Sequence, residues 1–465
     1  MADRVDAPRV RRGLLVLITA LLLAAPAVAG GLQAGVGQVG IRHTGGCSLT
    51  GCGGGPVVVQ ASPVRSAGLT RGVALDRQAS TAPLRVFASA HYHIHTDLDQ
   101  RDAVPYGRHM DAVHRDFSRR FRADATEAAD EKPMALYLFS TQARYVAFLR
   151  SLNIAGANSG GMFFITPRAH GLATYLQGQS TAETFAVLQH EGFHQFAWRH
   201  FHARLPQWLN EGIAQVFEDA PLVDGRLVLG STDTARLSRI QRDVRAGAAL
   251  PLNTLMALTP QHWNELLSGD PEASARLYAQ SWSVVYFLLN GDNGRLRAGF
   301  VRYLNLLRRL ESDAGALEKA FAVRGIDPIE RRWLAWIRNA QPTHLDTAEE
   351  RLRFIAAAIR YFDQQRLTVP GSMESFRQEL QRIGFTIRRT NGPLEETFRA
   401  SDRQHFRFVA AGATDRTPKL ADFQMLEPAR VDLPPRVTAP GLYPEPTLVW
   451  ARTPDGRLID SIEYR

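Results

Sequence analysis

The chain has 465 residues, a formal net charge of +9 and a pI of about 9.9, with 45% hydrophobic, 22% charged and 9% aromatic residues. This composition is that of a globular protein, and it excludes a collagen-like repeat, wholesale disorder and a polytopic membrane protein. At ~100–200 residues per domain, the length predicts two or three domains. The arginines that supply most of the positive charge are scattered among acidic residues, so we expect no nucleic-acid partner.

Residues 1–29 have the pattern of an export signal. Four arginines precede an apolar run over residues 13–25, and Ala27-Val28-Ala29 supplies a cleavage pattern of small residues. The sequence therefore predicts a periplasmic or secreted protein, which contacts a membrane only if the signal segment is kept as an anchor. Residues 30–83, rich in Gly and Ala, are expected to form a flexible linker. Within it, Cys47 and Cys52 either form a short disulfide or remain two thiols.

Residues 84–339 are expected to form an α+β domain in which strands come first and helices follow. The hydrophobic pattern predicts strands over 86–96, 133–139, 162–166 and 173–176, and helices over 111–121 and 141–149. From about residue 181 onward helices dominate, interrupted by a hairpin at Asp224-Gly225 and a loop over 290–294.

Residues 340–465 are predicted to form a separate small α+β domain of unknown role. Helices are expected over 346–364 and 372–383, followed by a Pro-rich extended stretch over 428–446. A closing hairpin is expected around Pro454-Asp455-Gly456. The predicted fold class is therefore α+β, with a short mixed sheet, a mainly helical region and a C-terminal α+β domain.

A candidate metal-binding motif lies on one predicted helix. Ser180 and Glu183 form a capping-box pattern, which begins a helix there. That helix carries His190-Glu191-Gly192-Phe193-His194, the pattern HExxH, whose two histidines share one helical face and can bind a single Zn²⁺. Glu191 stands where it can hold a zinc-bound water and accept its proton. The alternative is a helix whose histidines are solvated or packed in a core.

A catalytic zinc needs a third protein ligand, and the next predicted helix offers one. It reads Trp208-Leu209-Asn210-Glu211-Gly212-Ile213-Ala214, and a neighbouring helix can bring the Glu211 carboxylate to the metal. The rival is His200, which matches the last histidine of the pattern HExxHxxGxxH. That pattern has glycine where this chain has Ala197, and a helix that continues through Ala197 turns His200 roughly 120° away from His194. We therefore expect Glu211 to be the third ligand.

These motifs resemble those of a known family. HExxH followed by a helix that carries Glu211 is similar to the gluzincin metallopeptidases of the thermolysin-like clan. The order of strands, HExxH and Pro-x-Trp-Leu-x-Glu-Gly looks still more like the poorly characterised bacterial peptidase-MA-like domains. The resemblance covers roughly residues 85–335. It implies a zincin fold, a zinc site of His190, His194 and Glu211, and a peptide or protein substrate.

The implied activity is hydrolysis of peptide bonds by a zinc-activated water with Glu191 as the general base. By the same resemblance, Tyr278 donates a hydrogen bond to the oxyanion, and the alternative is a Tyr278 packed in the core. Gln215 and Glu218 are both candidates to accept a hydrogen bond from a ligand imidazole, and the alternative is that they lie on a solvated helix face. The competing hypothesis is a non-catalytic zinc-binding envelope protein with a structural or partner-binding role.

One further group of histidines lies near the start of the predicted domain. His91, His93 and His95 alternate, so they share one face of a predicted strand. They form either a surface metal site or an ordinary polar face.

Overall fold

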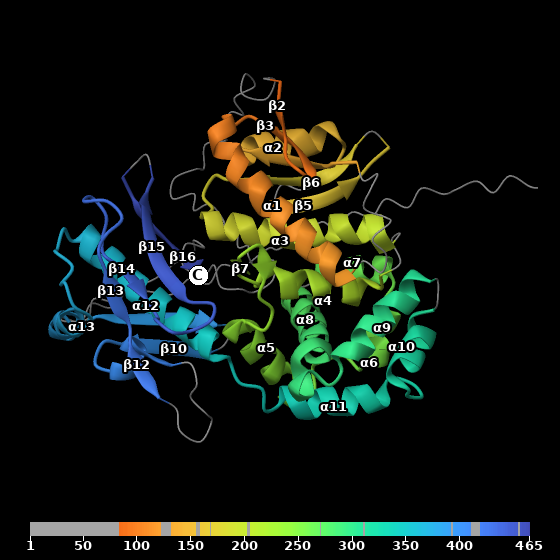
Figure 1. The fold of residues 1–465 in the computed structure, drawn as a ribbon. Coiled ribbons are helices and arrows are strands. Elements are labelled where there is room, and N and C mark those ends of the chain that lie inside the picture. Colours follow the sequence, from red (N-terminus) through yellow and green to blue (C-terminus); the bar gives the residue numbers. More distant parts are fainter. Residues whose placement is uncertain are drawn as a thin grey trace, which may run out of the picture.

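The computed structural model describes residues 83–121, 132–154, 159–167, 169–201, 205–269, 271–309, 312–391, 394–410, 419–453 and 456–465. The predicted export signal, both cysteines and nearly all of the predicted linker lie outside these residues. The fold is mixed α+β, as predicted from the sequence, with a sheet, a group of helices beneath it and a C-terminal α+β region (Figure 1). In the described part of the chain, no helix combines the length and apolarity that a membrane crossing needs.

The first layer is a five-stranded mixed sheet with the strand order β2-β3-β4-β6-β5. Strands β3, β4 and β6 run parallel, and β2 and β5 pair antiparallel at the two edges. The strands are β2 (Arg85–Ala88), β3 (Tyr92–Thr96), β4 (Met134–Phe139), β5 (Gly161–Ile165) and β6 (His170–Tyr175).

The single strand expected over 86–96 is a hairpin of β2 and β3. The carboxylate of Asp111 accepts hydrogen bonds from the backbone N–H groups of Ala90 and His91 at 3.1 and 2.8 Å. These bonds satisfy backbone donors in the connection and fix the turn there. The sequence pattern missed this turn because the group that stabilises it lies twenty residues further along the chain.

Helices cover both faces of the sheet. Alternate residues of β4 point to opposite sides, so that Leu136 packs against α1 (Gln100–Phe121) and α3, while Phe139 packs against α2 (Gln142–Ser151). Helix α3 therefore lies directly against the sheet, and the helices that follow it in the helical region lie on its other side (Figure 1).

The helical region follows the sheet, and its helices are α3 (Thr181–Phe201), α4 (Gln207–Glu218), α5 (Thr234–Arg245), α6 (Leu252–Ala257), α7 (Pro260–Gly269), α8 (Pro271–Gly294), α9 (Arg297–Arg308), α10 (Asp313–Phe321) and α11 (Asp327–Ile337). The predicted hairpin at Asp224-Gly225 joins β7 (Leu222–Val223) to β8 (Arg226–Leu227). The predicted loop over 290–294 interrupts the end of α8, where Asp292 and Asn293 have φ angles of 50° and 57°.

Helix α4 lies at the centre of this region, in contact with both α3 and α8. Its apolar residues Leu209, Ile213 and Phe217 recur at the spacing of one helical face and are buried. The approach to α8 is close at Gly212, where an added Cβ atom would lie 2.5 Å from the carbonyl oxygen of Ser281. Glycine at this position therefore determines how near the two helices can come.

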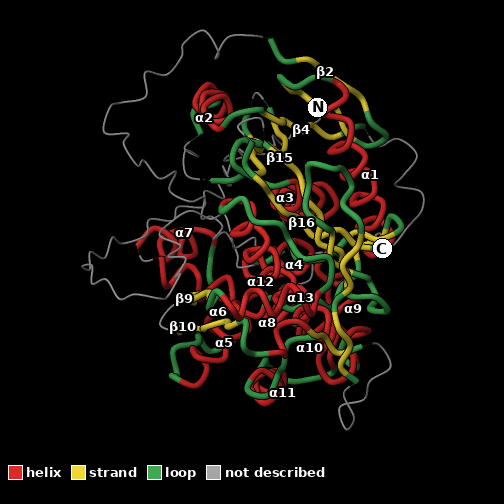
Figure 2. The backbone as a smooth tube through the Cα atoms, turned by 90° about the vertical axis from the view of Figure 1, so that its left-hand side faces the viewer, coloured by secondary structure: helices red, strands yellow, loops and turns green. Residues whose placement is uncertain are grey.

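The C-terminal region contains α12 (His344–Gln364), α13 (Met373–Arg382), the short helix η2 (Arg403–Phe406) and strands β9 (Thr386–Asn391), β10 (Leu394–Arg399), β11 (Arg407–Val409), β12 (Leu420–Asp422), β13 (Gln424–Leu426), β14 (Arg436–Thr438), β15 (Pro446–Arg452) and β16 (Leu458–Tyr464). Its buried side chains form a hydrophobic cluster separate from that of the helical region. Strands β15 and β16 pair as the predicted closing hairpin, and β16 lies beside α3 (Figures 1 and 2).

Candidate metal centre

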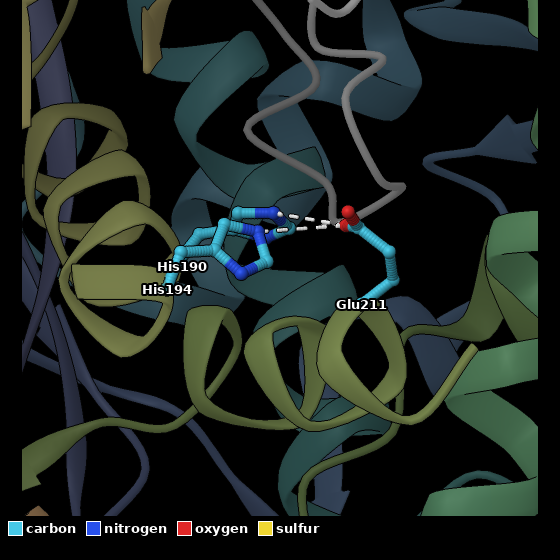
Figure 3. A group of neighbouring side chains, drawn as sticks. All are labelled: His190, His194 and Glu211. Carbon is cyan, nitrogen blue, oxygen red and sulfur yellow. Dashed lines mark ion pairs between the residues drawn. The ribbon is translucent and has the colours of Figure 1, made fainter. Parts of the chain in front are cut away.

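Helix α3 carries the HExxH motif and begins at the predicted capping box. The backbone N–H of Ser180 donates to Oε2 of Glu183 at 2.6 Å, and the N–H of Glu183 donates to Oγ of Ser180 at 3.2 Å. The helix runs without a break to Phe201. His190 and His194 lie one turn apart on the face of α3 that is turned toward α4, with ring centroids 4.9 Å apart (Figure 3).

Helix α4 brings Glu211 to these two histidines. Its Oε2 atom lies 3.6 Å from Nε2 of His190 and 3.6 Å from Nε2 of His194 (Figure 3). One ligand atom from each of the three residues lies within 4.8 Å of the others, and no other group of this kind occurs among the described residues. The three residues form a buried His-His-Glu group that can hold a metal ion.

The polar atoms of this group support the same interpretation. Nε2 of His190 and Oε2 of Glu211 are buried, and neither has a hydrogen-bond partner in the described structure. A buried polar atom without a partner costs about 1–3 kcal/mol. A cation between the side chains would satisfy both atoms at once, so the donor set fits a metal ion.

The charges in the group also favour a cation. Burial alone lowers the pKa of His190, but the close carboxylates of Glu211, Glu218 and Glu191 outweigh burial and raise this pKa well above its ordinary value. Burial alone raises the pKa of Glu211, but the neighbouring His194 and His190 lower it to about 2. Without a metal, the carboxylates therefore hold a positive charge on the His190 imidazole. A metal ion would take the place of that charge.

Glu218 orients the first histidine. Nδ1 of His190 lies 2.9 Å from Oε2 of Glu218, which is two turns beyond Glu211 on the same face of α4. An acceptor at Nδ1 fixes the imidazole so that Nε2 faces the metal position. Gln215, the other candidate from the sequence, instead donates to the backbone oxygen of Tyr278 at 3.2 Å.

Glu191 lies beside the metal position and is held by the edge of the sheet. Its Oε2 atom accepts a hydrogen bond from the backbone N–H of Phe163 in β5 at 2.7 Å. The side chain is 5% exposed, and the same backbone group of β5 is its single hydrogen-bond donor in the described structure. The carboxylate is therefore fixed in position with its second oxygen free to act on a water molecule.

Tyr278, on α8, is buried near the same carboxylates. Burial raises the pKa of Tyr278 well above its ordinary value, and the charges of Glu211 and Glu191 raise it further. The ring lies edge-on to Trp263, with centroids 5.8 Å apart. The hydroxyl has no hydrogen-bond partner within the described residues. The hydroxyl therefore stays protonated and is able to donate a hydrogen bond.

The structure leaves the other histidines outside this group. His200 packs against Phe196, with centroids 4.2 Å apart, because α3 continues through Ala197 as expected. His91 stacks on His114 and His95 stacks on Tyr137. The alternating histidines near β3 are not brought together into a metal-binding group in the described chain.

Two features of the site were not found from the sequence. The backbone N–H of Phe163 carries no sequence signal, since every residue except proline has one. The buried Arg236 on α5, which lies beside the end of α4, resembles any other arginine of an amphipathic helix. Gly212 could have indicated a packing constraint, because glycine inside a helical pattern costs stability relative to alanine.

One family model matches part of the sequence. It is described as a protein of unknown function (DUF1570), and it matches residues 184–309. The matched segment contains His190, Glu191, His194, Glu211 and Tyr278, but the family's description states no activity. No curated protein matches this sequence significantly.

Proposed function

We propose that this protein is an exported zinc metallopeptidase of the gluzincin type. The observation that carries the proposal is the meeting of three buried ligand atoms, from His190, His194 and Glu211, beside a further carboxylate. That carboxylate belongs to Glu191, and the edge strand β5 holds it in place through the backbone of Phe163.

The donor set favours zinc. Two imidazoles and one carboxylate are a usual set for catalytic zinc, which keeps one further position for water. When bound, the zinc ion would supply Lewis acidity, making the water a stronger acid and polarising the substrate carbonyl.

Two side chains near the metal position would transfer a proton and stabilise the negative charge that forms on the substrate. Glu191 takes the proton of the attacking water at Oε1, since Oε2 is engaged by Phe163, and later passes it to the leaving amine. The Tyr278 hydroxyl, kept protonated by burial and by the nearby carboxylates, donates a hydrogen bond to the oxyanion of the substrate.

A peptide or protein substrate fits the edge of the sheet. In the described chain, β5 pairs with β6 on one side and with no strand on the other. An extended peptide can add to such an edge through backbone hydrogen bonds. Because Phe163 in this strand contacts Glu191, the added peptide would lie next to the general base.

The deciding experiment compares two isosteric substitutions on α3. Glu191→Gln should keep the zinc and lower hydrolysis of an unbiased peptide mixture on the order of 10²-fold or more, because only the general base is lost. Glu183→Gln is the matched control, since glutamine also serves in a capping box. Cleavage products would be followed by mass spectrometry and bound zinc by elemental analysis.

The same measurements separate the two hypotheses from the sequence. Zinc-loaded protein that cleaves no peptide would favour a non-catalytic envelope protein. Undiminished cleavage by Glu191→Gln would assign the chemistry to other residues. Purified protein without any affinity for zinc would refute the proposal at its first step.

A further inference from the structure

A buried arginine lies next to the residue that orients His190. Arg236, in the first turn of α5, is 3% exposed and donates from Nη1 to Oδ2 of Asp219 at 2.7 Å. Its Nη2 atom lies 4.0 Å from Oε1 of Glu218. The other oxygen of Glu218 is the one that contacts Nδ1 of His190. The Glu218 carboxylate therefore lies between the guanidinium and His190.

The position of Arg236 is fixed on several sides. Nη1 also lies 3.5 Å from the backbone oxygen of Gln215, in the last turns of α4, where carbonyls without a partner inside the helix favour a positive charge. The guanidinium carbon lies 5.5 Å from the ring centre of Trp282 on α8. The arginine thus contacts both helices that approach the metal centre from this side.

The start of α5 is attached to the C-terminal region. The carboxylate of Asp346, in the first turn of α12, accepts hydrogen bonds from Oγ of Ser231 at 2.5 Å and from the backbone N–H of Thr232 at 2.7 Å. The next residue, Asp233, is the N-cap of α5 and accepts from the backbone N–H of Arg236 at 2.7 Å. Asp346 is itself 4% exposed, so this junction is buried.

These contacts form a continuous connection from α12 to the metal position. We propose that Arg236 is a positioning residue for the metal centre, and that the C-terminal region, through Asp346, fixes the helix that carries it. The arginine holds Glu218 against His190, and Glu218 in turn directs Nε2 of His190 toward the ion. A role thereby follows for residues 340–465, whose described part contributes no ligand to the centre.

The inference rests on the metal-binding part of the proposed function, and it is tested by metal affinity in the full chain. Zinc affinity is measured by competition with a chromophoric chelator at fixed pH. Arg236→Gln should weaken zinc binding about tenfold or more, the size typical of partners that orient a ligand. Arg239→Gln is the matched control, because Arg239 lies on the same helix and pairs with the half-exposed Glu272. It should leave the affinity unchanged.

A double-mutant cycle separates positioning from general stability. If Arg236 acts through Glu218, Arg236→Gln should weaken zinc binding less than threefold once Glu218→Gln is present. If Arg236→Gln does not fold, Arg236→Lys takes its place, because lysine keeps the charge without the planar fork. Additive effects of the two substitutions, or wild-type affinity in the arginine variant, would overturn the inference.

A separate pair of variants tests the contribution of the C-terminal region to zinc binding. Asp346→Asn should weaken zinc binding by a few-fold, whereas Asp363→Asn, which breaks a pair with Arg452 inside that region, should not. Equal zinc affinity in these two variants would refute the connection through α12. Wild-type protein that binds zinc without cleaving peptides would refute the proposed reaction alone, and the positioning role would stand.

Discussion

Replacing Gly212 by alanine should disturb both the fold and the metal centre. The added Cβ atom would lie 2.5 Å from the carbonyl oxygen of Ser281 and 2.7 Å from a methyl group of Val285, both on α8. Ordinary contact begins near 3.4 Å, so α4 and α8 must separate by about 0.9 Å, the difference between 3.4 and 2.5 Å. A backbone carbonyl inside a helix cannot turn away alone, so the whole helix must move.

The expected magnitude follows from two opposing effects. Alanine favours the helix over glycine by about 1 kcal/mol. Overpacking of a core costs about 1–3 kcal/mol, so Gly212→Ala should lower the free energy of unfolding by roughly 0–2 kcal/mol net. The neighbouring Glu211 moves with the helix. Because metal sites accept ligand displacements of only about 0.2 Å, zinc affinity should fall at least tenfold.

Gly192→Ala is the matched control within the HExxH motif. Its Cβ atom would meet the terminal methyl group of Met110 at 2.6 Å, and a flexible side-chain end can move aside. Unfolding by urea in metal-free protein and chelator competition for zinc would be measured for both variants. The reasoning fails if Gly212→Ala is as stable as Gly192→Ala and binds zinc as tightly.

Two further predictions concern buried polar groups. Burial, partly offset by a hydrogen bond with Gln189, lowers the pKa of His109 to about 4. The unfolded chain therefore takes up the proton first, at about pH 6.5, and the native state should lose about 2 kcal/mol between pH 7.5 and pH 5. Urea unfolding of wild type and His109→Gln tests this, because the variant should lack that part of the loss. Tyr278→Phe should lower kcat with little change in KM, and leave stability unchanged because the hydroxyl has no partner among the described residues. Lower stability at unchanged kcat would assign the hydroxyl to packing.

The local parts of the site could be predicted from the sequence because they follow from helix geometry. A spacing of four residues places His190 and His194 on one face, and an uninterrupted helix turns His200 away. The second helix, with its apolar face and Glu211, was readable for the same reason. The capping box at Ser180 and the closing hairpin were likewise local patterns.

Other parts depend on contacts between segments that are distant in sequence. The turn between β2 and β3 depends on Asp111, and the choice of Glu218 over Gln215 depends on how α4 is rotated against α3. The connection from Asp346 to Arg236 joins residues more than a hundred positions apart. Periodicity within a segment carries no information on such pairings, which arise only when the elements pack.

The closeness of the three ligands along the chain has a consequence for the order of assembly. His190, His194 and Glu211 lie within residues 190–211, on two successive helices, and closing so short a loop costs little conformational entropy. Phe163 also precedes them, so the ligands and the support of Glu191 are synthesised before α5 and α12. An ion can therefore be captured by a partly folded chain. The ion should then dissociate more slowly once Arg236 and Asp346 have reached their native positions. We therefore expect tight retention of the metal to develop late in folding.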